Sequence, residues 1–187
     1  MKLRTMLPVA AAAVSSMLLM AAPAFATSAS ATLTAGSLAF ATTPGAVNFP
    51  STNLNGQDKA VTTPQPLDIA DATGSGAGWN VTATSTVFKS GSNSLPAGAT
   101  TVTSAPAAPT CDSNSTCTPA TSTGVSYPYS LPAGATTAPT ATKLFNAPLG
   151  SGMGDQTVTP TWTLAIPANA YAGSYTSTWT LSLVSGP

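Results

Sequence analysis

The chain lacks several of the side chains on which enzymes most often rely. It contains no histidine and no glutamate, and its only arginine is Arg4. A serine or thiol hydrolase needs an imidazole base, and zinc sites usually take histidine ligands. The sequence also has no Gly-rich phosphate loop that ends in Lys and Ser or Thr. We therefore expect a protein that is not an enzyme and has no catalytic residue, no cofactor and no metal site.

Charged residues are scarce, at 5% of the chain, and they offer no basic surface. Beyond residue 26, Lys59, Lys89 and Lys143 stand against five aspartates, which leaves a balance of two negative charges. Nucleic acids and anionic lipids are bound by clusters of Lys and Arg. Neither class of partner is therefore expected.

Two of the aspartates, Asp68 and Asp71, lie close together in a segment that has the pattern of a strand. Their odd spacing places them on opposite faces of that strand, so they do not form an evident acid/base pair. A calcium site completed by backbone carbonyls is an alternative, but five aspartates in the whole chain make it a poor one. We expect these carboxylates to be solvated or to bond turns.

The first 26 residues have the pattern of an export signal. Lys2 and Arg4 form a basic start, residues 7–22 are almost wholly apolar, and Ala-Phe-Ala at 24–26 fits the cleavage rule of small residues. An uncleaved membrane anchor is the alternative, which Pro23 and the cleavage site disfavour. We expect cleavage after Ala26.

No apolar run after residue 26 is long enough to span a bilayer, so we expect no membrane span in the mature chain. The sequence shows no Leu-Pro-x-Thr-Gly sorting signal, and no cysteine that follows the signal closely enough for a lipid anchor. We expect a secreted, extracellular protein that is released or held at the surface without a covalent tether.

The two cysteines are Cys111 and Cys117, six positions apart. In an exported protein this spacing favours a local disulfide that clamps the loop between them. The alternative is a reactive thiol or a metal pair, and the chain lacks the further ligands that a metal pair would need.

Beyond the signal, helix-forming residues are few, and Thr, Ser, Gly and Pro dominate. Many short segments alternate as half-buried strands do, and turn residues separate them. Residues 90–142 are richer in Thr, Ser, Pro and Ala and should carry long exposed loops. The pattern predicts an all-β fold, a single antiparallel β-sandwich or barrel-like domain over 27–187. The expected strands are 31–34, 37–41, 47–49, 59–63, 67–71, 78–88, 100–104, 124–131, 157–166 and 174–184.

The three tryptophans are the largest apolar anchors, and each is followed two residues later by an aliphatic on the same strand face. Such a residue commonly fills a sandwich core, whereas an exposed ring could stack on sugars. If 157–166 and 174–184 pair as neighbours, their tryptophans share a sheet face as core. The tryptophan after the Gly-rich turn at 74–78 is the best placed of the three for ligand contact. The three pairs are Trp79 with Val81, Trp162 with Leu164, and Trp179 with Leu181.

Two of these motifs lie in a familiar context. The run Gly-Ser-Gly-Ala-Gly-Trp-Asn-Val-Thr-Ala at 74–83, the strand before it at 67–71, and Ala-Gly-Ser-Tyr-Thr-Ser-Thr-Trp-Thr-Leu-Ser at 172–182 resemble the WxL-domain cell-surface proteins of Gram-positive bacteria. The first motif departs from the pattern, with Val81 in place of Leu. Trp162-Thr163-Leu164 is an additional copy, and the Cys111–Cys117 loop is a local elaboration.

The resemblance implies a WxL-like β domain over 27–187 that attaches non-covalently to the cell wall. It implies peptidoglycan, or another wall polymer, as the partner, with other cell-surface proteins as further partners. The six motif residues would then bind the wall or hold the domain together. A second hypothesis is a secreted structural or matrix subunit that self-assembles through the edges of its β-strands.

Overall fold

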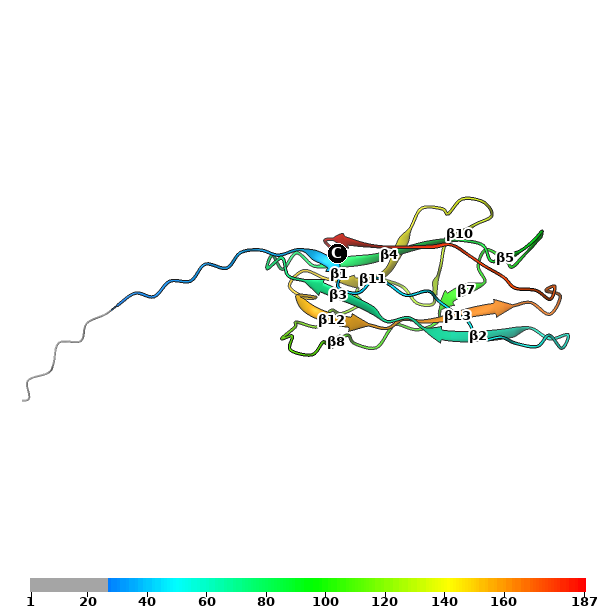
Figure 1. The fold of residues 1–187 in the computed structure, drawn as a ribbon, viewed down its shortest axis with the longest axis horizontal. Coiled ribbons are helices and arrows are strands. Elements are labelled where there is room, and N and C mark those ends of the chain that lie inside the picture. The colour runs from blue at the N-terminus through cyan, green and yellow to red at the C-terminus, as the bar shows by residue number, and fades with distance from the viewer. Residues whose placement is uncertain (1–26) are drawn as a thin grey trace, which may run out of the picture. The chain divides into compact units, whose positions relative to one another are not determined.

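A computed structural model describes residues 27–187 (Figure 1), so the expected export signal at 1–26 and the cleavage after Ala26 lie outside the described residues. The chain divides into two units, Met1–Leu33 and Thr34–Pro187. In the first unit, residues 27–33 are extended and exposed and form no strand. The second unit contains the folded domain.

The folded domain is built from strands, and the described residues contain no helix. This confirms the all-β expectation, which rested on the alternating pattern and the abundance of Thr. Apart from a short parallel pairing of β10 with β4, the described strands pair antiparallel. The strands are β1 Leu38–Phe40, β2 Lys59–Pro64, β3 Leu67–Asp71, β4 Trp79–Thr86, β5 Lys89–Ser90, β6 Asn93–Ser94, β7 Thr100–Val102, β8 Thr110–Cys111, β9 Tyr129–Ser130, β10 Ala133–Gly134, β11 Thr142–Ala147, β12 Gly154–Val158, β13 Thr161–Ile166 and β14 Trp179–Ser185.

One layer of the sandwich is a long ribbon with a break in its middle. β3 pairs with β12, and the preceding β2 pairs with the following β13, so two successive ladders run along the same two stretches of chain. Pro66 and Pro160 occupy the breaks, where proline cannot donate to a ladder. The Gln65 N–H donates to Pro160 O at 3.0 Å and joins the two ladders. The expected single strand 157–166 is therefore two strands.

Short strands extend this layer on both sides. β1 flanks β3, β8 flanks β12, and β7 followed by β9 flanks β13. The second layer has β4 at its centre, with β14 on one side and β11 and β10 on the other. β11 was not among the expected strands, and neither 31–34 nor 47–49 forms one. In the expected segment 124–131 the strand is β9 alone.

The hydrophobic core lies between the two layers. Trp79 and Trp162 are fully buried in it, together with Leu67, Ile69 and Leu144. The burial of β3 alternates perfectly, because every second side chain faces the core. Strand alternation thus predicted the buried face correctly.

The expected pairing of the last two long strands is wrong. β13 pairs with β2 and β7, whereas β14 pairs with β4 in the other layer. Residues 167–178 connect a strand of one layer to a strand of the other instead of forming a hairpin. Trp162 and Trp179 still meet, at 4.8 Å between ring centroids, but across the core and not on one sheet face. The local pattern predicts the strand face on which each ring lies, but it does not predict which strands pair.

Candidate functional site

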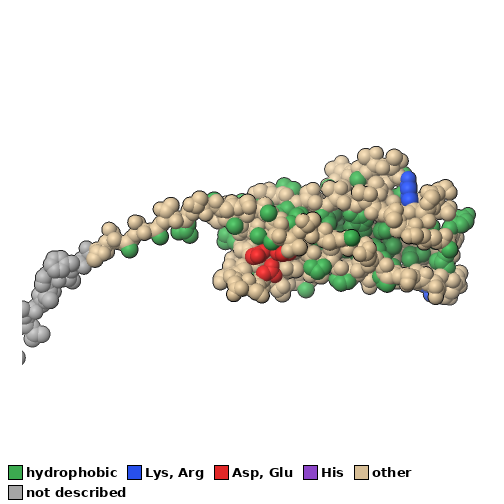
Figure 2. All heavy atoms as spheres, viewed as in Figure 1, with side chains coloured by type: hydrophobic (Ala, Val, Ile, Leu, Met, Phe, Trp, Pro, Cys, Tyr) green, Lys and Arg blue, Asp and Glu red, His purple; other side chains and the backbone are tan. Residues whose placement is uncertain are grey.

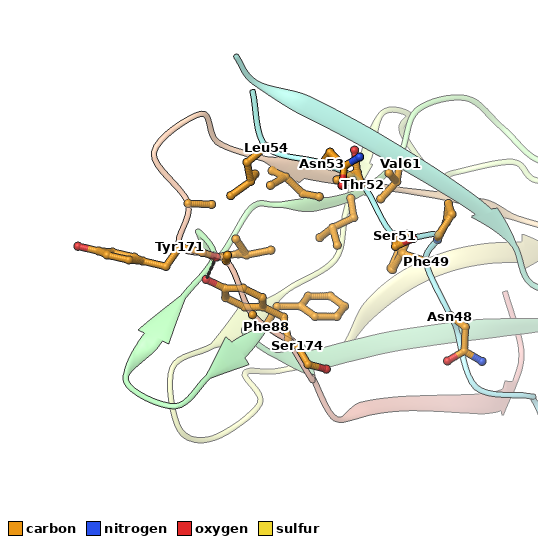
Figure 3. Close-up of a pocket in the computed structure, with 18 of the residues that line it drawn as sticks. Asn48, Phe49, Ser51, Thr52, Asn53, Leu54, Val61, Phe88, Tyr171 and Ser174 are labelled. Atoms are coloured by element: carbon orange, nitrogen blue, oxygen red, sulfur yellow. Dashed lines mark hydrogen bonds between the residues drawn. The ribbon is translucent and has the colours of Figure 1, made fainter. Parts of the chain in front are cut away.

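An open groove of about 760 Å³ lies along one side of the domain (Figure 3). Residues 44–54, here called the crossing segment, run between β1 and β2 without forming a strand, and residues 47–54 of this segment form one wall of the groove. The other wall is the loop at 170–175, before β14. The floor comes from side chains of β2 and β13, with Phe88 and Leu95. The groove therefore lies at the side of the sandwich, between the layer that contains β2 and β13 and the loop that leads to β14 in the other layer.

The groove combines an aromatic interior with a polar rim. Phe49 and Phe88 pack edge to face in it, with ring centroids 6.0 Å apart. Tyr171 is 68% exposed at one end and projects away from the body of the domain (Figure 3). Amide and hydroxyl groups complete the lining, from Asn48, Ser51, Thr52, Asn53 and Ser174.

Every lining side chain of this groove is uncharged. Apolar pockets with a few polar groups bind ligands by shape, apolar contact and hydrogen bonds. Aromatic rings with a polar tip suit a ligand that has both apolar faces and hydroxyls. The groove can therefore take an uncharged polar ligand such as a sugar chain, and its lining offers no cation to hold a phosphate.

The loop that carries Tyr171 is held at several points. The Tyr175 hydroxyl donates to Tyr171 O at 2.9 Å, and the Ala168 N–H donates to the Asp58 carboxylate at 2.7 Å. Gly173 lies so close to the side chain of Ser90 that a Cβ at this position would clash with it. The Tyr171 ring is thus exposed while its backbone is fixed, which suits a contact residue.

A series of aromatic rings connects the core to this groove. Tyr129 and Trp162 have centroids 6.3 Å apart, and Trp162 contacts Trp179 in a T-shaped pair. Trp179 in turn packs on Phe88 at 6.4 Å, and Phe88 lies against Phe49. Trp179 is half-buried and also lines a second groove beside the crossing segment. Two of the predicted site residues therefore support the groove from behind.

A buried glutamine links the same motif to the groove wall. The Trp162 indole N–H donates to Gln65 Oε1 at 2.9 Å, and Gln65 Nε2 donates to Gly45 O at 2.9 Å. Gln65 is only 4% exposed, so both bonds form in a poorly solvated place. Residues 46–56 make no backbone–backbone hydrogen bond with any other part of the described chain. The glutamine is therefore a main polar anchor of this wall.

The expectation that Trp79 is the best placed tryptophan for ligand contact is wrong. Its ring is fully buried, its indole N–H donates to Gly152 O at 2.9 Å, and it packs against Phe145. The Gly-rich turn before it leaves the ring inside, because the whole inner face of β4 is covered by the other layer. Val81 is equally buried.

The remaining motif aliphatics differ in exposure. Leu164 is 6% exposed and forms part of the groove floor. Leu181 is half-buried and lines the second groove. The residues that the sequence did not single out are Phe49 and Tyr171. The available signal for Tyr171 was a lone aromatic residue in an Ala- and Gly-rich connection.

Three carboxylates meet at the other end of the long ribbon. Asp68 on β3, Asp112 after β8 and Asp155 on β12 offer oxygens that all lie within 4.8 Å of one another. Figure 2 shows acidic side chains gathered in one patch on an otherwise mostly uncharged face. The sequence could not reveal this cluster, because its members are far apart along the chain. Asp71, by contrast, lies on the core side of β3, opposite to Asp68 as the odd spacing predicted, and it accepts bonds from the turn at Thr73.

The electrostatics of the cluster are those of like charges held together. Partial burial raises the pKa of the Asp155 carboxyl, and the neighbouring Asp68 and Asp112 raise it further. Asp68 accepts a hydrogen bond from Thr42, and Asp112 accepts one from Thr157. Carboxylate oxygens are the ligands that Ca²⁺ prefers, so these three residues are the described group most suited to a hard cation.

The expected disulfide between Cys111 and Cys117 is present, with Cα atoms 5.5 Å apart. It closes a loop that is bonded to β12, since the Asp112 N–H donates to Asp155 O at 3.0 Å and the Asp155 N–H donates to Ser115 Oγ at 3.0 Å. The bridge thereby holds Asp112 beside Asp155.

Among residues 27–187 the structure has no helix of the length and hydropathy that a membrane span requires. The sequence model of one protein family, described as WxL domain surface cell wall-binding, matches residues 21–187. The comparisons with curated proteins and with solved structures find no significant match.

Proposed function

Because the chain belongs to the WxL-domain family of surface cell wall-binding proteins, we propose that it attaches to the wall by binding peptidoglycan in the groove beside Tyr171. The protein is extracellular and associated with the cell wall, as the family match over nearly the whole chain establishes. The finer proposal has three parts. Peptidoglycan is the polymer bound, the attachment is not catalytic, and the groove is the place of contact.

The observation that carries the proposal is an uncharged groove with an exposed, well-supported aromatic ring. The glycan strand of peptidoglycan offers sugar rings with apolar faces and many hydroxyl and amide groups. Tyr171 can stack on such a face, and the amides of Asn48 and Asn53 can bond the ring substituents. Anionic wall polymers carry phosphates, which the groove has no cation to meet.

The tryptophan motifs enter this proposal as supports and not as contacts. Trp162 and Trp179 pack in series behind Phe88 of the groove floor, and Trp79, on β4, lies in the hydrophobic core. The chain also has no imidazole and no glutamate for bond cleavage, which favours a binding role. Many weak contacts along a repeating polymer would give firm attachment from modest single sites.

The test is sedimentation of the purified protein with peptidoglycan from which other wall polymers have been removed. Tyr171→Ala should weaken binding at least about tenfold, if one stacked ring contributes about 1.5 kcal/mol. The variant should fold normally, because the Tyr175 hydroxyl bonds the backbone of residue 171 and not its ring.

Leu149→Ala is the matched control. Leu149 is 78% exposed but does not line the groove, so its replacement tests whether exposed apolar side chains adhere nonspecifically to the polymer. This variant should bind as the unchanged protein does. Equal binding by all three proteins would overturn the groove as the site. No sedimentation by the unchanged protein would overturn peptidoglycan as the ligand.

A further inference from the structure

β14 is an edge strand with a free side. It pairs along its full length with β4, and it has no second partner strand among the described residues. The Thr86 N–H bonds Thr178 O at one end, and the Gly186 N–H bonds Gly78 O at the other. Because hydrogen-bonded pairs alternate along an antiparallel ladder, the even-numbered residues of β14 direct their N–H and C=O groups toward β4. The amides and carbonyls of residues 179, 181, 183 and 185 therefore point outward.

The free side of β14 lacks the features that usually protect an edge. Strand edges are normally blocked by lysine, proline, a bulge or a very short strand. β2, which is also paired on one side only, has Lys59 at its start and Pro64 at its end. β14 has seven residues, none of them charged and none of them proline. It can therefore accept another strand.

A second groove, of about 500 Å³, opens beside this edge. It lies between the crossing segment at 44–48 and the inward side chains of Trp179 and Leu181. β1 lies near β14 without pairing with it. An added strand would thus find backbone groups on the edge and an apolar surface for every second side chain.

The chain itself contains a segment with the matching pattern. Residues 28–35 read Ser-Ala-Ser-Ala-Thr-Leu-Thr-Ala, a strict alternation of hydroxyl and apolar side chains. β14 alternates in the same way, with inward Trp179, Leu181 and Leu183 and outward Thr180 and Ser182. Residues 28–35 are exposed and form no strand, and Leu33 is 90% exposed.

We propose that residues 28–35 of a second copy of this chain add as a strand to the free edge of β14. The small apolar side chains of the added strand enter the second groove, and its hydroxyls extend the outer Thr and Ser face of the sheet. Neither segment carries a charge, so no repulsion opposes the pairing. The contact is not self-complementary, so it produces open chains of copies unless two copies exchange segments.

This interface is small, and the association in solution is therefore weak. It goes beyond wall binding, because it makes each attached copy a docking point for the next. Attachment to a wall raises the local concentration of copies, which favours such weak contacts.

The test compares the full exported chain with Ala31→Pro and Ala31→Val by sedimentation velocity over a range of concentrations. Proline removes a backbone donor from the middle of the added strand, and one lost ladder bond with its displaced neighbours should weaken association about tenfold. Valine keeps the donor and favours a strand, so Ala31→Val should associate at least as well as the unchanged chain.

Hydrogen exchange supplies a readout specific to the edge. With rising concentration the amides of residues 179, 181, 183 and 185 should become protected in the unchanged chain and not in Ala31→Pro. A chain that stays monomeric, association that Ala31→Pro leaves intact, or protection that spares these amides would each overturn the proposal.

Discussion

At the scale of single residues, the domain joins its core to its groove through a few buried polar contacts. Gln65 accepts from Trp162 and donates to Gly45, so one side chain connects a motif tryptophan to the start of the crossing segment, whose later residues form the groove wall. Buried polar groups of this kind cost little while both partners are present and much when one is lost. The tryptophan motif thus affects the groove through its hydrogen bond as well as through its volume.

Gln65→Met keeps the length of the side chain and removes both hydrogen bonds. It leaves the buried indole N–H of Trp162 without its partner, which should lower the free energy of unfolding by about 1–3 kcal/mol. Urea unfolding measures the change. Gln57→Met is the control, because Gln57 is exposed and its side chain makes no bond to the described residues, so a change within about 0.5 kcal/mol is expected. Equal effects of the two variants would contradict this role of Gln65.

The Asp155 carboxyl leads to a prediction about pH. Its pKa is raised in the folded protein by partial burial and by Asp68 and Asp112, so the folded state holds the proton more tightly than the unfolded state does. The free energy of unfolding should therefore increase as the pH falls from neutral through this raised pKa, and level off near the unfolded value of about 3.9.

Asp155→Asn removes the charge and should make the protein more stable at neutral pH, with a flatter dependence on pH over the same range. Thermal unfolding of both proteins across the acidic range measures this. A variant that is less stable than the parent at neutral pH would show that the ionised carboxylate stabilises the folded state, which is the opposite of the expected effect.

At the scale of elements, the disulfide loop is an added brace on β12. Cys111 lies in β8, which pairs with β12, and Gly154 at the start of β12 packs directly against Cys117. The brace holds the end of the ribbon that carries the acidic cluster, and the groove lies at the opposite end.

Replacing Cys111 and Cys117 together by serine should lower the free energy of unfolding by about 2 kcal/mol, the scale for so short a closed loop. Guanidinium unfolding under oxidising conditions measures the loss. The parent protein after reduction should match the double variant, which controls for the serine side chains. Equal midpoints for the oxidised parent and the variant would mean that the loop is held by its hydrogen bonds alone.

The elements also show how far the sequence could lead. β3 and β4 were predicted well, because alternation with bulky apolar residues is a strong signal. The expected strand 174–184 is confirmed in its second half, but β14 begins at Trp179 and not at residue 174. β11 was not predicted because its sequence does not alternate: residues 144–147 are all buried, and the register with β4 shifts between Lys143 and Phe145. The pairing of β13 and β14 could not be predicted, since alternation specifies a face and not a partner.

The groove was harder to predict than the fold for a related reason. Residues 47–49 alternate as a strand does, yet they are part of the crossing segment and pair with no strand of the described chain. Phe49 and Tyr171 come from two loops that only the folded chain brings to one groove. The tryptophans were the visible signal, and they identify the family and its core. Tyr171, the contact residue that we propose, lies in a loop rich in Ala and Gly.

At the scale of the whole molecule, charged side chains are few and unevenly placed. Three of the five aspartates are grouped at one end of the ribbon, and the groove with its uncharged lining lies at the other. Residues 27–187 carry two excess negative charges, so this part of the chain gains nothing from net attraction to an anionic wall. Binding through stacking and hydrogen bonds should accordingly change little with salt.

The most direct test of wall binding through the groove is residue-resolved NMR of the domain during titration with soluble peptidoglycan fragments that retain the glycan strand. We expect shifts confined to the groove, at Asn48, Phe49, Tyr171 and Ser174, with Asp112 and Leu149 unchanged. Shifts centred on the acidic cluster, or no shifts at saturating fragment, would contradict the assignment of the groove as the wall-binding site.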